Sequence, residues 1–179
     1  MPVRIALLRG VNLGAARRVA MADVRRTLEK AGFGEVRSLL QSGNLVFESA
    51  EAGEAAIEAT VEGALLADLG LRTEVVVRGG EAWRAMIAAN PFPHEAEEDP
   101  SHLVAMVLKT DPAAGAAEAM AEIAESERAR VIGRVAYISY PKGIADSRLV
   151  GAALDKALGA RGTARNWNTV RKLAAAVGL

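Results

Sequence analysis

Near its N-terminus the chain reads Val3-Arg4-Ile5-Ala6-Leu7-Leu8, in which every residue except Arg4 is apolar. An unbroken apolar run of this length lacks the alternation of a strand with one wet face, so it predicts a central strand covered on both faces. The run continues into Arg9-Gly10-Val11-Asn12-Leu13-Gly14, where glycine and asparagine end the strand pattern. We therefore expect a buried strand that leads into a polar loop at one edge of its sheet.

The rest of the first half alternates between helical and strand-like patterns as far as residue 78. In chain order the expected elements are a helix over 21–31, strands over 35–41 and 45–48, a helix over 54–69, and a strand over 72–78. Both helices are followed by a glycine, the residue that most often ends a helix. With the first strand they give the order βαββαβ, which is that of a ferredoxin-like plait.

The second half nearly repeats this order. Its expected elements are a helix over 81–89, a strand over 103–109, a helix over 112–127, hairpin strands over 130–132 and 135–140, and a helix over 147–158 capped by Ser147. The proline-rich segment 90–93 ends the first of these helices, and residues 94–100 have the composition of an acidic loop. The resulting order, βαββα, is one strand short of a second plait.

These patterns predict an α+β fold of two ferredoxin-like subdomains packed together, the second of them incomplete. We expect the first subdomain over residues 1–79, and a connecting helix plus the second subdomain over residues 80–162. Residues 163–179 then form a C-terminal polar segment and a last helix. A chain of 179 residues is long enough to bury a substantial core in this arrangement.

Composition narrows the classes of function. The 22 basic and 22 acidic side chains cancel, whereas proteins that grip a nucleic-acid backbone usually carry a basic excess, so the balance argues against that partner. The absence of cysteine excludes disulfides and thiolate nucleophiles. We see no signal-peptide pattern and no apolar run of the roughly 20 residues that a membrane span needs. We expect a cytoplasmic protein without membrane association.

Topology brings two polar segments to the same place. In a βαββαβ plait the first and third strands are antiparallel neighbours, so the end of the first and the turn into the third lie at one edge of the sheet. The ligand-binding candidates at this edge are Arg9, Asn12, Gly14, Gln41, Ser42 and Asn44. They combine a planar guanidinium, neutral amides and glycine backbone, which suit an anionic or amide-bearing small ligand.

A purely structural role for the same residues stays open. Asparagine and serine in turns commonly bond their own backbone, and Arg9 has the option of pairing with an acidic side chain of the neighbouring half. Neither segment contains a histidine, a cysteine or a carboxylate, so we assign no catalytic residue.

A second polar cluster lies in the C-terminal segment, at Arg165, Asn166, Trp167 and Asn168. Here a structural role is the stronger interpretation. A tryptophan can anchor the last helix by burial, and an asparagine can cap its first turn. His94 stands beside several acidic residues, but these are consecutive and lack the spacing of metal ligands. We therefore expect no metal site and no cofactor.

Several segments resemble the bacterial family called domain of unknown function 1697. They are Leu7-Leu8-Arg9-Gly10-Val11-Asn12-Leu13-Gly14, Met21-Ala22-Asp23-Val24-Arg25, Gln41-Ser42-Gly43-Asn44-Leu45-Val46-Phe47, Asn90-Pro91-Phe92-Pro93, Tyr140-Pro141-Lys142-Gly143 and Thr163-Ala164-Arg165-Asn166-Trp167-Asn168-Thr169-Val170. The resemblance spans essentially the whole chain and implies a two-part, ferredoxin-like fold with no established activity. The family often carries a second glycine and a lysine or asparagine after Gly14; residues 15–18 of this chain depart from that pattern but keep its basic charge.

The sequence therefore leaves three functions open. The first is a binding module for a small anionic or amide-bearing ligand at the edge of the first sheet. The second, by analogy of fold with acylphosphatases, is a phosphate-ester or acyl-phosphate hydrolase that uses Arg9 or Arg17 with Asn44. The third is a structural homodimer built through an exposed sheet edge.

Overall fold

The computed structural model describes residues 1–13 and 18–179, and the chain divides into two compact units. The first unit comprises Met1–Arg84 together with Lys172–Leu179, and the second comprises Ala85–Arg171. Each unit contains one four-stranded antiparallel sheet, and seven helices lie within the described residues. The fold is thus a mixture of helices and antiparallel sheets, as the sequence predicts.

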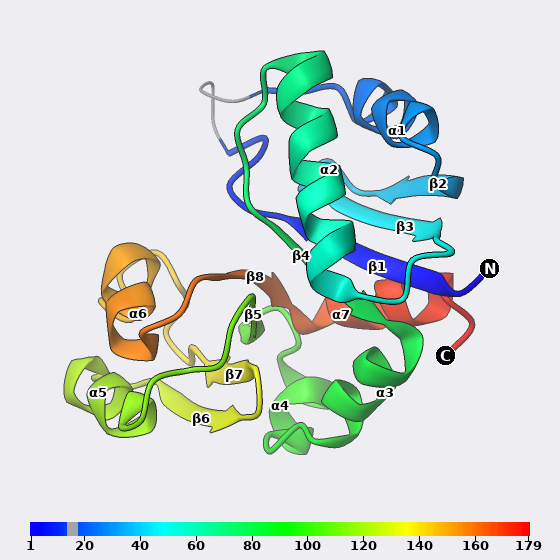
Figure 1. The fold of residues 1–179 in the computed structure, drawn as a ribbon. Coiled ribbons are helices and arrows are strands. Elements are labelled where there is room, and N and C mark those ends of the chain that lie inside the picture. The colour runs from blue at the N-terminus through cyan, green and yellow to red at the C-terminus, as the bar shows by residue number, and fades with distance from the viewer. Residues whose placement is uncertain (14–17) are drawn as a thin grey trace. The chain divides into compact units, whose positions relative to one another are not determined.

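The first unit has the predicted order of elements. They are β1 (Val3–Leu8), α1 (Met21–Lys30), β2 (Gly34–Leu39), β3 (Asn44–Glu48), α2 (Glu54–Leu69) and β4 (Val75–Gly79). In the sheet the strands follow the order β2-β3-β1-β4, so β1 lies between β3 and β4 and runs antiparallel to both (Figure 1). The predicted neighbourhood of the first and third strands is confirmed.

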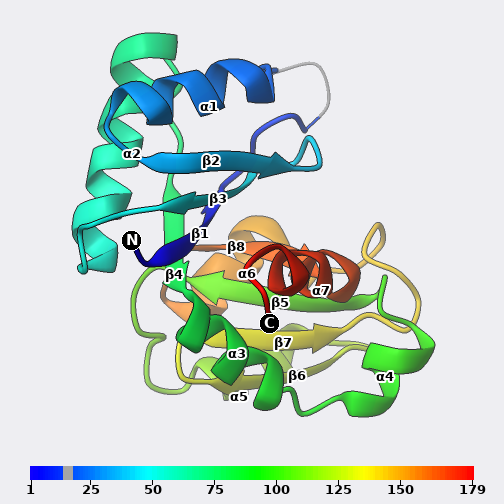
Figure 2. The same ribbon diagram turned by 90° about the vertical axis from the view of Figure 1, so that its right-hand side faces the viewer.

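The core of this unit lies between its sheet and the two helices on one face of it (Figure 2). Ala6 and Leu8 of β1 point into this core, where Val24 and Leu28 of α1 also lie. Ile5 and Leu7 alternate with them and are only 1% exposed, so β1 is buried on both faces. Because both faces of β1 are buried, apolar side chains are favoured on both of them, which explains the nearly uninterrupted apolar run.

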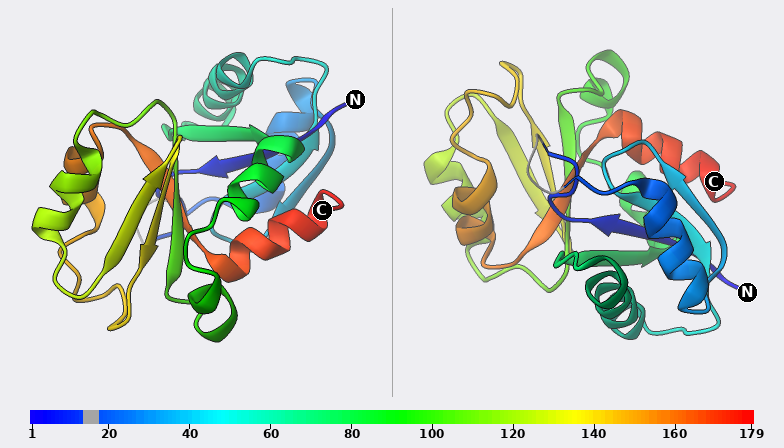
Figure 3. Two further views of the ribbon diagram at one scale, coloured as in Figure 1. Left: turned by 90° about the horizontal axis from the view of Figure 1, so that it is seen from below. Right: turned by 90° about the horizontal axis from the view of Figure 1, so that it is seen from above.

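The second unit contains α4 (Pro93–Glu98), β5 (Leu103–Leu108), α5 (Ala116–Ile123), β6 (Arg128–Ile132), β7 (Val135–Ser139), α6 (Gly151–Leu158) and β8 (Gly162–Asn166). The chain passes between the units through α3 (Gly80–Ala88) and α7 (Trp167–Ala176). The sheet order is β6-β7-β5-β8, which places β6 at one edge. Helices α5 and α6 cover one face of this sheet, where Met120 and Leu158 join its core (Figure 3).

The second half is not one strand short, which corrects the sequence-based expectation. Gly162–Asn166 forms β8 and pairs antiparallel with β5, from Leu108 opposite Gly162 to Val104 opposite Asn166. The strand escapes recognition because its buried positions include the polar residues Thr163 and Arg165, which hydrogen-bond to each other at 2.7 Å. Apolar periodicity, the main signal for a strand, is therefore absent from β8.

Two further expectations change. The acidic segment 94–100 is mostly helical, because Pro93 occupies the first turn of α4, where its fixed φ suits a helix and its missing N–H is not needed. Ser147 does not cap α6, which begins at Gly151. Its hydroxyl instead donates to Glu127 and accepts from the backbone N–H of Leu149.

Candidate functional site

The two predicted loops meet at one edge of the first sheet. The backbone N–H of Leu8, at the end of β1, donates to the carbonyl of Gly43 over 2.8 Å. The side-chain amide of Asn12 donates to the carbonyl of Gln41 over 2.6 Å. These bonds join the loop after β1 to the turn before β3.

Asn12 acts as a clamp within this edge. Its side-chain oxygen accepts from the N–H of Val19 at 2.8 Å, and its amide nitrogen donates to the carbonyl of Val19 at 3.1 Å as well as to Gln41. The residue adopts a left-handed backbone with φ of 53°, a conformation that asparagine tolerates better than most residues. One side chain thus holds Val19 and Gln41 in fixed positions.

The other predicted residues of the turn mainly support its structure. Asn44 is fully buried and donates to the carbonyl of Leu39 at 3.1 Å and to the Ser42 hydroxyl at 2.9 Å. Gly43 has φ of 76°, and a Cβ atom at this position would lie 2.5 Å from a methyl group of Val11. Glycine is therefore required here by packing and backbone conformation, not by the approach of a ligand.

As the structural interpretation anticipated, Arg9 has an acidic partner, but this partner is Glu74 of the same unit and not a residue of the second half. Its Nε lies 3.9 Å from a carboxylate oxygen of Glu74, and its own carbonyl accepts from the Thr73 hydroxyl at 2.8 Å. The remaining predicted residue of the edge, Gly14, lies outside the described residues, as does Arg17 of the hydrolase hypothesis.

A pocket of about 500 Å³ lies beside the Asn12 clamp. It is lined by Asn12, Arg18, Val19, Ala20 and Gln41, and we call it the clamp pocket. Of the five predicted residues that the structure describes, Asn12 and Gln41 line it. Ala20 is the N-cap residue of α1 and has no polar side chain with which to cap the helix, so the positive end of the helix dipole faces this region.

The second predicted cluster is built into the fold of the second unit. Trp167 is 2% exposed, and its ring lies 6.4 Å from that of Tyr137 between centroids. The side-chain oxygen of Asn166 accepts from the N–H of Thr169 at 3.0 Å and so caps α7. Arg165 is buried, which lowers the pKa of its guanidinium to about 10. Asn168 is exposed. These contacts give the cluster a structural role.

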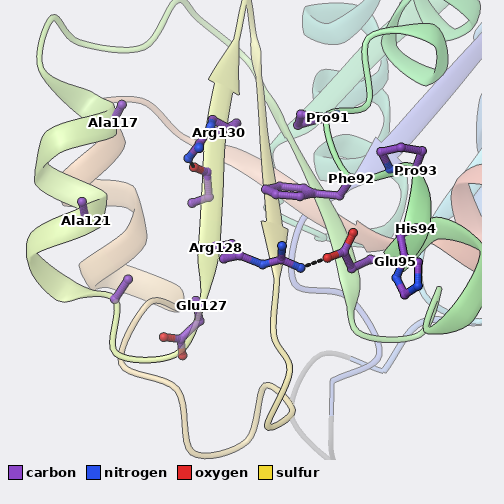
Figure 4. Close-up of a pocket in the computed structure, with 12 residues that line it drawn as sticks. Pro91, Phe92, Pro93, His94, Glu95, Ala117, Ala121, Glu127, Arg128 and Arg130 are labelled. Carbon is purple, nitrogen blue, oxygen red and sulfur yellow. Dashed lines mark hydrogen bonds and ion pairs between the residues drawn. The ribbon is translucent and has the colours of Figure 1, made fainter.

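A larger pocket, of about 950 Å³, lies in the second unit and was not predicted (Figure 4). It runs along β6 between α5 and the segment that leads into α4, and we call it the β6 groove. Arg128 forms an ion pair with Glu95 and lies over the ring of Phe92, 5.4 Å from the centroid. The sequence predicted only residues 130–132 of this strand, and nothing there indicated a groove.

Glu127, at the start of the β6 groove, has a strongly acidic carboxyl group. Hydrogen bonds lower its pKa to about 2, first from the Ser147 hydroxyl and then from the backbone N–H groups of Glu125 and Ser126. Because the pKa is depressed in the folded state, the stabilisation is present above pH 4.5. It is lost as the pH falls from there towards 2.

We expect Ser147→Ala to raise the pKa of Glu127 towards 4.5, because the largest cause of its depression is removed. Titration of the carboxyl carbons by NMR measures this directly. The neighbouring Glu125 serves as the internal control, since its carboxylate pairs with Arg148, whereas the Ser147 hydroxyl donates to Glu127. An unchanged titration of Glu127 in the variant would assign the depression to the backbone donors alone.

The residues that the structure describes contain neither a cluster suited to a metal ion nor a helix suited to span a membrane. Within residues 1–13 and 18–179 we find no cluster of three or more histidine, aspartate or glutamate side chains that is suited to a metal ion. None of the helices in the same residues has both the length and the apolar character needed to cross a membrane.

Comparison with known proteins connects this geometry to a family. No curated protein matches the sequence. The solved structure of the conserved bacterial protein SP0830 from Streptococcus pneumoniae is similar over 100% of this chain and 99% of its own, with a TM-score of 0.74 and 18% sequence identity. At that identity the likeness extends to the fold alone. The model of DUF1697, a family described as protein of unknown function, matches residues 1–137. The chain therefore belongs to the DUF1697 family.

Proposed function

We propose that this protein is a binding module for a small anionic or amide-bearing ligand, and that the ligand occupies the clamp pocket at the edge of the first sheet. One observation carries the proposal. Three hydrogen bonds of Asn12 hold Val19 and Gln41 around a single concave space, into which Arg18 brings a positive charge.

The chemistry of the lining suits an anion. Arg18 is exposed and carries a guanidinium, whose planar donors pair well with carboxylate or phosphate. The first turn of α1 adds backbone N–H groups and the positive end of a helix dipole. Gln41 is also exposed and contributes a neutral amide, which can donate and accept. A volume of about 500 Å³ is within the usual range of small-molecule sites.

The same proposal includes a ferredoxin-like plait as the scaffold. The element order βαββαβ and the strand order β2-β3-β1-β4 of the first unit support it. We do not extend the proposal to hydrolysis. Both N–H groups of the Asn44 amide are bonded inside the turn, and the residue has no exposed surface with which to orient a water molecule.

Ligand screening by thermal shift tests the binding module. Phosphates, nucleotides and small carboxylates are compared on the parent protein and on Arg18→Gln. An anion that binds the folded state raises the melting temperature. Loss of a charge-assisted contact worth about 1.5–3 kcal/mol should weaken affinity at least about tenfold in the variant.

Arg72→Gln is the matched control, because Arg72 is exposed and its replacement changes the net charge equally. We expect it to respond as the parent does. Equal responses from all three proteins would contradict a role for Arg18, and a screen in which no anion raises the melting temperature would contradict the anion site as a whole.

A further inference from the structure

We propose that the β6 groove binds an extended segment of another protein that carries one acidic residue between two apolar ones, and that this segment adds a fifth strand to the second sheet beside β6. The groove lies within the second unit, and its floor is the edge strand of that sheet. This inference concerns a surface remote in sequence from the clamp pocket and does not depend on it.

The backbone of β6 offers hydrogen-bonding groups at its outer edge. β6 and β7 are joined by a two-residue turn, and Ile132 pairs with Val135 across it, followed by Arg130 with Tyr137. In an antiparallel ladder hydrogen-bonded pairs alternate with non-bonded ones, so the N–H and C=O groups of Ala129 and Val131 point away from β7. The Ala129 carbonyl indeed accepts from a side chain, the guanidinium of Arg130, at 2.9 Å.

The two walls of the groove leave room for an added strand. Figure 4 shows Ala117 and Ala121 of α5 on one side of β6, with Phe92 and Pro93 on the other. Both alanines are exposed, so α5 presents small side chains next to the edge. Ala129 and Val131 pack on the same face of the sheet as α5. Added residues opposite them would therefore contact an apolar wall.

The positive charge on β6 indicates which kind of segment the groove would bind. Arg128 and Arg130 are exposed and alternate with Ala129 and Val131, so both project from the opposite face of β6. A residue placed opposite Arg130 in an added strand would have its side chain beside the guanidinium, where an acidic group is favoured. The geometry therefore specifies three consecutive residues, apolar-acidic-apolar. A second copy of this chain fits poorly, because a two-fold axis at Arg130 would oppose two guanidinium groups.

The experiment uses the whole protein and a blocked peptide, Ac-Thr-Val-Glu-Val-Thr-NH2, followed by NMR. Titration to about 5 mM covers the dissociation constant of about 1 mM expected for a few hydrogen bonds. We expect shifts at Ala129 and Val131 and slower hydrogen exchange of their amides. The same peptide with lysine in place of glutamate should bind about three- to tenfold more weakly. Arg130→Glu should reverse this preference.

N-methylation separates strand addition from other kinds of binding. Methylating both valine nitrogens removes the donors that face Ala129 and Val131 and should abolish binding. Methylating the glutamate nitrogen, which faces away from β6, should leave it intact. Three results would overturn the proposal: no binding of any peptide, as expected if Arg130 merely protects the edge; equal binding of the valine-methylated peptide; or protection of Ala129 and Val131 by self-association without peptide.

Discussion

Replacement of Trp167 with alanine should lower the free energy of unfolding by about 3–5 kcal/mol, the range for truncating a large aromatic side chain in a core. Trp167 is 2% exposed and begins α7, and its ring contacts that of Tyr137. The Tyr137 hydroxyl donates to the carbonyl of Met86 at 2.6 Å, so the cavity would open beside a buried hydrogen bond. Urea unfolding followed by circular dichroism measures the loss.

Asn168→Ala is the control for this prediction. Asn168 is the next residue of the same helix and is exposed, so its replacement should change stability by no more than about 0.5 kcal/mol. If Trp167→Ala unfolded at the same urea concentration as the parent, the tryptophan would not anchor the helix. The cluster of Arg165, Asn166, Trp167 and Asn168 would then again be a candidate ligand site.

Gly43→Ala should destabilise the protein by about 2–5 kcal/mol, through two separate effects. The backbone at Gly43 has φ of 76°, where a side chain costs roughly 1–2 kcal/mol. The new methyl group would also lie 2.5 Å from a methyl of Val11 and 2.8 Å from the Cβ of Leu8, and overpacking of this kind costs about 1–3 kcal/mol. Equilibrium unfolding in urea gives the sum.

Gly70→Ala separates the two effects. Gly70 ends α2 with φ of 61°, and no atom lies within 4 Å of its Cβ position among those the structure describes. This variant should therefore lose only the conformational part, roughly 1–2 kcal/mol. If Gly43→Ala cost no more than Gly70→Ala, the tight packing of the turn between β2 and β3 would be contradicted.

The first sheet could be predicted because its strands obey simple burial patterns. β1 is apolar on both faces since both are buried, and Met21, Val24 and Leu28 keep a helical spacing because one face of α1 enters the core. β8 could not be predicted in this way. Its buried Thr163 and Arg165 satisfy each other by a hydrogen bond that depends on the folded strand, and no apolar pattern reveals it.

The sequence predicted where the candidate site lies, but not which of its side chains line the pocket. Topology correctly brought the loop after β1 to the turn before β3, and Asn12 and Gln41 do line the clamp pocket. Whether a polar side chain faces a ligand or its own backbone depends on local bonds that a sequence does not show, and Asn44 illustrates the second outcome. The β6 groove escaped notice because its walls come from separate segments, around Phe92 and along α5.

The clamp pocket is tested most directly by mapping where an anion binds. In a ¹⁵N NMR titration with the best anion from the thermal-shift screen, the account predicts concentration-dependent shifts at the backbone amides of Val19, Ala20 and Met21 and at the side-chain amides of Asn12 and Gln41. These shifts should weaken together in Arg18→Gln and persist in Arg72→Gln. Shifts confined to other residues, or an unchanged response in Arg18→Gln, would contradict the proposed site.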